Sequence, residues 1–256
     1  MLRPLIKLLR LGGLIVSGLV LALFFYPGMD RAARDRKLMA WASRLMAILE
    51  IDVQVCGVIP GGALGGVLGG ALPQSGVVLV ANHVSWLDIH VLHSLLPARF
   101  ISKAEVRHWP LLGRLALAAG TLFISREKKS DAIRVNQAMA AELQAGECLA
   151  FFPEATTTDG RGLRPFFPSL FQPAVDAGCS VVPAAIRYFD KQGEPCLAAA
   201  YYGEMTLLAS IWRIVRIPGL RVEITFLPAL TAQGMHRREL AKQAEAAIRA
   251  ALGLAA

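Results

Sequence analysis

Charged side chains are scarce in this chain of 256 residues, and acidic ones are the scarcer kind. Only 18% of the residues are charged, with 19 Asp and Glu against 27 Lys and Arg, so the formal net charge is +8. Hydrophobic residues make up 55% and the mean hydropathy is +0.48, which is high for a soluble enzyme. The basic residues form no stripe interleaved with aromatic residues, which argues against nucleic acid as a partner. A hydrophobic and basic chain instead predicts contact with an anionic membrane surface or an anionic substrate.

The sequence also lacks cysteine motifs for redox chemistry or metal binding, and it lacks a serine nucleophile motif. The cysteines form no CxxC pair and no metal-ligand spacing with histidine, so reduced, partly buried thiols and a cytosol-facing domain are expected. They are Cys56, Cys148, Cys179 and Cys196. The chain contains no G-x-S-x-G, so it has no serine nucleophile elbow.

The first 29 residues predict a hydrophobic helix that anchors the chain to a membrane. Arg3, Lys7 and Arg10 precede an uncharged run over 11–29, which as a helix would be about 28 Å long, close to the hydrocarbon thickness of a bilayer. No A-x-A-like cleavage site is present, which favours a retained anchor over a removed signal peptide. Basic residues flank both ends of the run, so the positive-inside rule gives no orientation. A single span and a helix lying in one leaflet both fit this pattern.

Residues 30–56 predict an amphipathic helix followed by a first strand. Leu38, Trp41, Leu45 and Leu49 recur at helical spacing, and IDVQVC is typical of a strand. This apolar stripe fits core packing and a membrane interface equally, with Trp41 at headgroup level in the second case.

Strand-like and helix-like segments alternate over 57–256. VVLVA, ARFISK, TLFISR, CLAFFPE and SVVPAAIRYF are short apolar runs, and helical patterns separate them. The alternation predicts an α/β fold, a mixed sheet flanked by helices, with its chemistry at strand ends. The glycine-rich segment over 61–76 predicts a flexible hairpin connection. Pro183, inside one strand-like run, predicts an edge strand or a bulge.

The segment NHVSWLD follows a buried strand and has two interpretations. Ser85 and Asp88 are spaced as in a capping box, with Ser85 as the N-cap of a helix. The same segment places Asp88 where it can orient His83 as a base that takes a proton from a hydroxyl, which the substrate would supply. His90 and His93 could join this pair in a metal site, but HxxH without other ligands is a weak signal, so no metal is predicted.

Two further segments place polar groups at predicted strand ends. GTLFISR ends at Arg126, whose guanidinium suits bidentate binding of phosphate. FFPEATTTDG places Glu154 and Thr156 in a turn whose hydroxyls and amides can hold an anion. Taken singly, a solvated charge cluster and an ordinary polar turn explain these two segments better.

Together, the order and spacing of these segments resemble the glycerolipid acyltransferase family, of the lysophosphatidate acyltransferase type. The four blocks read NHxxxxD, GxxFIxR, FPE-x-T and VP, and they lie within residues 75–190. The matching residues are Asn82, His83 and Asp88, then Gly120, Phe123, Ile124 and Arg126, then Phe152, Pro153, Glu154 and Thr156, and last Val182 and Pro183.

The resemblance implies transfer of a fatty acyl group from acyl-CoA or acyl carrier protein to the free hydroxyl of a lysolipid, converting 1-acyl-sn-glycerol-3-phosphate to phosphatidate, with no cofactor and no metal. It implies that His83 is the general base and that Asp88 orients it. Backbone amides near Val84 or Thr156 are candidates for holding the oxyanion. The substrate-binding residues that it implies are Asn82, Arg126, Glu154, Ala155, Thr156 and Arg164.

Two positions depart from the family pattern. Ala155 stands where Phe-Pro-Glu-Gly-Thr has glycine, and its methyl group is expected to crowd the backbone or to disfavour a positive φ. Where the family often has Pro-Phe-Lys, this chain has phenylalanine at position 167, so Arg164 is the candidate replacement for the lysine. The TTTDG and PSLFQPA segments look closer to bacterial lyso-ornithine lipid O-acyltransferases, which makes lyso-ornithine lipid the alternative acceptor.

The implied partners are a lysolipid, a thioester donor and the bilayer. They place the protein at the bacterial inner membrane with its active site facing the cytoplasm, because the acceptor lies in the bilayer and the donor arrives from the cytosol. Two other classes fit parts of the sequence. An inactive membrane lipid-binding protein would bind lysolipid without turnover, and a hydrolase that uses His83 to activate water would release fatty acid without an acceptor.

Overall fold

The computed structural model describes residues 2–60, 76–124 and 129–255. The glycine-rich segment, apart from Gly76, and Arg126 lie outside these described residues. The strands are β1 (Asp52–Cys56), β2 (Val77–Ala81), β3 (Arg99–Lys103), β4 (Leu122–Ile124), β5 (Cys148–Phe151), β6 (Ser180–Phe189), β7 (Arg221–Phe226) and β8 (Leu230–Thr231). The α-helices are α1 (Leu2–Val20), α2 (Arg31–Leu49), α3 (Leu87–Leu95), α4 (Leu112–Ala118), α5 (Lys129–Gln144), α6 (Gln172–Ala177), α7 (Leu207–Ile214) and α8 (Arg237–Ala251). Short helical turns are η1 (Leu21–Phe25), η2 (Tyr26–Gly28), η3 (Ala104–His108), η4 (Pro168–Phe171) and η5 (Leu197–Ala199).

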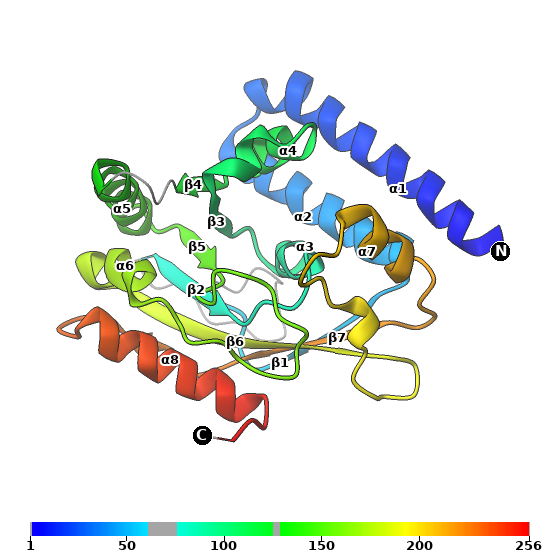
Figure 1. Cartoon of the computed structure of the whole chain (residues 1–256). Helices are drawn as coiled ribbons and strands as arrows, with labels where there is room; N and C mark the ends of the chain where they lie inside the picture. The colour runs from blue at the N-terminus through cyan, green and yellow to red at the C-terminus, as the bar shows by residue number, and fades with distance from the viewer. Residues whose placement is uncertain (1, 61–75, 125–128, 256) are drawn as a thin grey trace.

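An eight-stranded mixed sheet runs through the centre of the described residues, flanked by helices on both faces (Figure 1). The strand order is β1-β7-β6-β2-β5-β3-β4, and β8 pairs with β6. Neighbours are parallel except that β6 is antiparallel to β7 and β8. The predicted α/β fold with a mixed sheet is therefore confirmed. The predicted hairpin between β1 and β2 is wrong, because β7 and β6 lie between these two strands.

The central strand β2 is buried on both faces, which explains its unbroken apolar run. Every residue of β2 is buried, as expected of a strand covered by helices on both sides. Val77, Leu79 and Ala81 join the core that includes α2 and α3. Val78 and Val80 point the other way, into the core that includes α5, α6 and α8. The strand is therefore rigidly held where it ends, directly before Asn82.

Pro183 lies in the central strand β6, so the predicted edge strand is wrong. Pro183 is opposite Val80 of β2, and its carbonyl accepts a hydrogen bond from the Leu227 amide at 2.9 Å. A residue's N–H and C=O point to the same side of a strand, so the missing donor of the proline also faces Leu227. That position lies in the gap between β7 and β8, where the antiparallel ladder is interrupted.

The N-terminal helix packs along α2 on one side and exposes apolar side chains on the other. Residues Leu2–Gly28 form one helical stretch that is long and apolar enough to cross a membrane, and its 18-residue apolar window has a mean hydropathy of 2.2. Leu11 and Leu14 are buried, and the buried Lys7 ammonium donates to the Leu49 carbonyl at 3.1 Å. Gly18 lies where α1 meets α2, since an added Cβ would come within 2.7 Å of the Trp41 indole nitrogen.

Trp41 settles the two interpretations of the stripe on α2 in favour of core packing. Its indole N–H donates to the Leu14 carbonyl at 2.9 Å, and Leu45 and Leu49 are each 1% exposed. The stripe therefore faces α1 and α3 instead of a membrane.

Candidate active site

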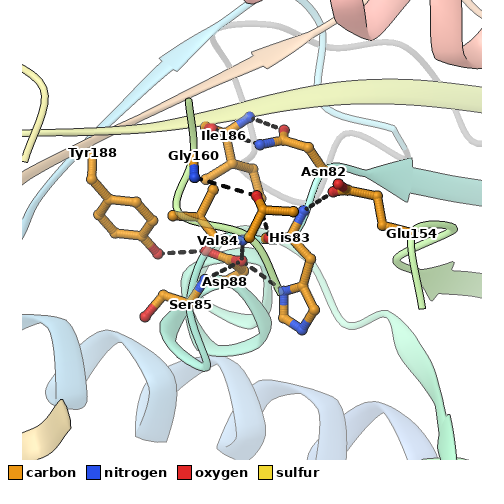
Figure 2. Close-up of polar contacts among 10 residues, drawn as sticks. Asn82, His83, Val84, Ser85, Asp88, Glu154, Gly160, Ile186 and Tyr188 are labelled. Carbon is orange, nitrogen blue, oxygen red and sulfur yellow. Dashed lines mark hydrogen bonds and ion pairs between the residues drawn. The ribbon is translucent and has the colours of Figure 1, made fainter. Parts of the chain in front are cut away.

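The site lies where β2 and β5 end. These two strands are parallel neighbours, with Val80 opposite Phe151, so the residues that follow them emerge at the same edge of the sheet. His83 follows β2 and Glu154 follows β5, and the two segments meet through hydrogen bonds (Figure 2).

His83 and Asp88 form the pair that their spacing predicts. His83 Nδ1 lies 2.8 Å from Asp88 Oδ2, so the ring N–H donates to the carboxylate and Nε2 keeps the free lone pair (Figure 2). Asp88 is fully buried, whereas the His83 side chain is 16% exposed. A buried carboxylate that fixes the tautomer of a partly exposed imidazole is suited to proton transfer.

The predicted Ser85 cap is wrong, although the carboxylate part of that pattern is present. The residue that precedes α3 is Trp86, and the Ser85 hydroxyl is buried without a hydrogen-bond partner among the described residues. Instead Asp88 Oδ2 accepts from the Val84 amide at 2.8 Å and from the Ser85 amide at 2.9 Å. One carboxylate thus holds both the first turn of the helix and the imidazole. Because Asp88 occupies the Val84 amide, that amide is not available to an oxyanion.

Tyr188 holds the other oxygen of Asp88, and no sequence pattern pointed to it. Its hydroxyl donates to Asp88 Oδ1 at 2.6 Å, across 100 residues of the chain (Figure 2). Burial, and then the adjacent carboxylate, raise the pKa of Tyr188 well above its usual value of 10.0, so the hydroxyl stays a donor. A hydrophobic strand residue carries no local signal of such a role, since β6 reaches Asp88 only in the folded sheet.

The loop after β5 clamps the main chain of His83 from both sides. Glu154 Oε1 accepts from the His83 amide at 2.7 Å, and the Thr158 amide donates to the His83 carbonyl at 2.8 Å. The Phe152 ring stacks on the imidazole, with centroids 3.8 Å apart and an interplanar angle of 4°. These contacts leave the imidazole little freedom besides its bond to Asp88.

Glu154 and Asn82 are both occupied by main-chain groups. The second oxygen of Glu154 accepts from the Arg164 amide at 2.9 Å, and Glu154 is 2% exposed. Burial raises the pKa of Glu154, while the amides of Arg164 and His83 oppose that rise. The Asn82 amide donates to the Ile186 carbonyl at 3.0 Å and accepts from the Ile186 amide at 2.7 Å. These two side chains tie the site segments to each other and to β6.

An apolar cavity of about 520 Å³ adjoins His83. Its walls come from α1 to α4, from the segment before α7, from α7 itself and from the loop after β5. They include Leu11, Ile15, Trp41, Leu45, Trp86, Phe100, Leu115, Phe152, Tyr201, Leu207 and Ile211. Among the predicted site residues, His83, Ala155 and Thr156 line this cavity. Its size and apolar walls suit a hydrocarbon ligand.

His90 and His93 line the same cavity but do not join His83 in a metal site. The His90 ring lies between the rings of Trp41 and Trp86, with centroid distances of 5.5 and 5.9 Å. His93 Nε2 lies 2.9 Å from the Ala98 carbonyl. Burial lowers the pKa of His90 to about 3 and that of His93 to about 4, so both rings are neutral at physiological pH. Within the described residues, no group of three His, Cys, Asp or Glu side chains could hold a metal ion.

Of the two predicted arginines, the structure describes only Arg164, which does not line the cavity. The Arg164 side chain is exposed, and only its main-chain amide contacts the site, through Glu154. Arg126 lies outside the described residues, so its predicted role stays a prediction. The substrate-binding roles of Asn82, Glu154 and Arg164 also stay predictions, and the main-chain contacts give the first two a structural role as well.

Ala155 adopts the backbone conformation that glycine would take in the family pattern. Its φ is 58°, in the left-handed region. A residue with a Cβ pays about 1–2 kcal/mol for that conformation, so the methyl group strains the turn without preventing it. The turn geometry is therefore retained despite the substitution, and the predicted conflict appears as strain.

Replacing Ala155 with glycine is expected to raise stability by about 0.5–1 kcal/mol, because the left-handed strain exceeds the extra entropy of glycine in the unfolded chain. Thermal unfolding followed by circular dichroism would show a midpoint about 1–4 °C higher. Ala119→Gly is the matched control, since Ala119 has φ −74° and offers no strain to relieve. A lower midpoint for both variants would contradict the strain at Ala155.

Comparisons with known proteins agree with these observations. A family model described as Acyltransferase matches residues 69–187. The chain is 42% identical to a lyso-ornithine lipid O-acyltransferase from Pseudomonas aeruginosa, over 98% of this chain and 94% of that protein. It is 38% identical to a 1-acyl-sn-glycerol-3-phosphate acyltransferase from Neisseria meningitidis, over 85% of this chain and 81% of that protein. The crystal structure of a 1-acyl-sn-glycerophosphate acyltransferase from Thermotoga maritima has the same fold, with a TM-score of 0.72 at 21% identity, covering 98% of this chain and 94% of that one.

Proposed function

Because the chain belongs to the family of lysolipid and 1-acylglycerol-3-phosphate acyltransferases, we propose that it is a membrane-bound O-acyltransferase that moves a fatty acyl group from a thioester to the free hydroxyl of a lysolipid. One observation carries this proposal above all. A histidine with a fixed tautomer opens onto an apolar cavity, in a chain without a G-x-S-x-G nucleophile.

The geometry supports direct transfer without an acyl-enzyme. His83 Nε2 takes the proton of the acceptor hydroxyl as its oxygen attacks the thioester carbonyl carbon. The C–O bond forms, the C–S bond breaks, and the proton on His83 passes to the departing thiolate. Asp88 stabilises the imidazolium that exists between these two proton transfers.

The apolar cavity is the proposed site for the acyl chain. Its walls come largely from α1, α2, α3 and α4, and His83 lines one wall, beside which the reacting carbonyl would lie. Trp41 and Phe100 offer no charge, and His90 and His93 are neutral, so these walls suit a hydrocarbon chain, while the charged Lys103 of the lining is exposed.

Lyso-ornithine lipid is the proposed acceptor, and 1-acylglycerol-3-phosphate is the second candidate. The relative matched over nearly the whole chain carries the first name, and the Neisseria relatives carry the second. Arg126, Thr156 and Arg164 are the groups proposed to meet the headgroup. The proposed donor is acyl-CoA or acyl carrier protein, reaching the site from the cytoplasm.

The N-terminal helix is the proposed anchor in the bacterial inner membrane. Leu2, Leu9, Val16 and Phe24 are each 60–74% exposed, so α1 and η1 present apolar side chains away from the domain. The opposite side of α1 is packed on α2 through Lys7 and Leu11. A helix with one face on the domain and one face free fits insertion into a single leaflet better than an independent span.

A transfer assay with purified protein tests the proposed reaction. Labelled acyl-CoA and acyl carrier protein are offered in turn against lyso-ornithine lipid and 1-acylglycerol-3-phosphate. Product that requires an acceptor is expected, and its identity names the headgroup. Fatty acid release without an acceptor would show a hydrolase instead. Binding of lysolipid with no product from any pair would show an inactive lipid-binding protein.

Glu154→Gln is expected to lower stability by about 1–3 kcal/mol, because the amide nitrogen of glutamine would face the N–H of either His83 or Arg164. The loop would then hold His83 less firmly, and kcat is expected to fall about tenfold with the acceptor KM unchanged. Thermal unfolding and steady-state kinetics on both substrates measure these effects. The control is Glu194→Gln at an exposed glutamate. A rise in acceptor KM at constant kcat would instead assign Glu154 to the acceptor headgroup.

A further inference from the structure

The short helix α7 is apolar on both sides. Ser210 and Ile214 are buried and Leu207 and Ile211 line the cavity, which accounts for the inner side. A helix on the surface of a domain normally turns polar side chains outward, but on α7 the large apolar Leu208 and Trp212 are exposed beside Arg213. Packing in the domain does not account for the outer side of α7.

The outer side of α7 presents two large apolar side chains one turn apart. Leu208 is 78% exposed and Trp212 is 49% exposed. Tyr202, in the segment before the helix, is 45% exposed. The guanidinium of Arg216 lies over the Trp212 ring at 5.4 Å from its centroid, and Arg213 is also exposed. Apolar and aromatic side chains next to exposed arginines form a surface that suits an anionic bilayer interface.

The position of α7 in the fold gives this surface a place beside the N-terminal helix. α1 and α7 lie on the same side of the sheet (Figure 1). Leu11 and Leu14 of α1 and Ile214 of α7 belong to one core, and both helices border the cavity. The free apolar side chains of α7 and of α1 therefore lie on the same side of the sheet, around one shared cavity.

Two hydrogen bonds tie α7 and the segment before it to the catalytic turn. The Trp86 indole N–H donates to the Ser210 hydroxyl at 3.0 Å. The Tyr201 amide donates to the Val84 carbonyl at 2.8 Å. Val84 and Trp86 lie between His83 and Asp88 in the chain. The position of α7 is therefore coupled to the position of the turn that carries the base.

We propose that the outer side of α7, formed by Leu208 and Trp212 with Arg213 and Arg216 beside them, docks on an anionic lipid bilayer as a second lipid contact besides α1. This inference rests on the proposed membrane-bound function. Docking sets the distance of His83 from the lipid surface, through the hydrogen bonds of Ser210 and Tyr201. The bilayer is favoured over a protein partner because the surface lies on the same side of the sheet as the apolar side of α1 and carries exposed arginines.

Vesicle binding of the full-length protein tests the docking surface. The double variant Leu208→Ser with Trp212→Ser is compared with wild type on vesicles of phosphatidylglycerol and phosphatidylethanolamine. Vesicle affinity is expected to fall roughly tenfold or more. Val58→Ser is the control, because Val58 is 57% exposed and lies beyond β1, away from α7 in the chain. It is expected to bind vesicles as wild type does.

Acyl transfer to acceptor presented in vesicles and in detergent micelles provides the second readout. Activity on vesicles is expected to fall roughly tenfold and activity in micelles to stay within about twofold, with the unfolding midpoint unchanged. Unchanged vesicle binding overturns the proposal. An equal loss of activity in vesicles and micelles would show a structural role for the two side chains, and would overturn the proposal. A wild-type dimer that becomes monomeric in the variant would show that a second copy of the chain covers this surface, and would also overturn the proposal. Absence of product from wild type in both systems contradicts the proposed function, while the binding measurement still decides the docking surface.

Discussion

Replacing His83 with alanine is expected to lower kcat for acyl transfer by about 10³-fold, within the range that general acid–base catalysis contributes. The variant loses the only imidazole among the described residues that Asp88 contacts, and the neighbouring His90 and His93 are neutral rings held by other groups. Single-turnover transfer from the donor to the lysolipid measures the chemical step directly.

The fold of the His83→Ala variant is expected to survive. The main-chain contacts of His83 with Glu154 and Thr158 do not depend on its side chain. The variant loses the stacking on Phe152 and the hydrogen bond to Asp88, whose carboxylate keeps the amides of Val84 and Ser85 and the Tyr188 hydroxyl. His108→Ala is the matched control, because His108 is exposed in η3. Undiminished turnover in the His83 variant, with His108→Ala equally active, would contradict the assignment of the base.

Replacing Asp88 with asparagine is expected to lower kcat by about 10²- to 10³-fold, the range seen when one preorganised electrostatic contact is removed. Oδ2 accepts from His83 Nδ1 and from the amides of Val84 and Ser85, so the asparagine oxygen is expected to take that position. The side-chain NH₂ would then face Tyr188, whose hydroxyl can turn and accept. The tautomer of His83 is thus kept, and the loss comes from the missing negative charge beside the imidazolium.

A second substitution separates charge from structure at Asp88. Tyr188→Phe in the Asp88→Asn background removes the acceptor for the NH₂ group, so the unfolding midpoint is expected to fall while kcat changes little further. Asp176→Asn, at an exposed aspartate, is the control for loss of a negative charge. If Asp88→Asn already lowered the midpoint as much as the double variant, Tyr188 would not be accepting from the asparagine.

The apolar runs predicted the sheet because their signals are local. VVLVA became β2, and SVVPAAIRYF became β6, since short apolar runs between turn residues pack as buried strands wherever they lie in the order. The alternation did not predict α7, and it could not give the strand order. Strand order depends on which runs pair over long separations, so the expectation of a hairpin between β1 and β2 was wrong.

The candidate base His83 could be predicted from the sequence because its partner Asp88 is close in the chain. His83 and Asp88 are five residues apart, and any helix that begins between them brings the two side chains together. Tyr188 lies 100 residues from Asp88, and Glu154 lies 71 residues from His83. These contacts exist because β6 and β5 are the two neighbours of β2, which no local pattern states.

The same difference between local and long-range signals applies to Ala155 and to the apolar surfaces of α1 and α7. The resemblance to the family pattern marked Ala155 as a residue that could be under strain, because that pattern has glycine at this position of a short turn. The sequence by itself marked 1–29 as a hydrophobic helix, because length and composition suffice for that. Only the tertiary structure decided that α1 lies along α2, that Glu154 and Asn82 hold main-chain groups, and that Leu208 and Trp212 face outward. Burial and long-range hydrogen bonds are properties of the packed chain, so the residues that share them are known only once the sheet has brought distant segments together.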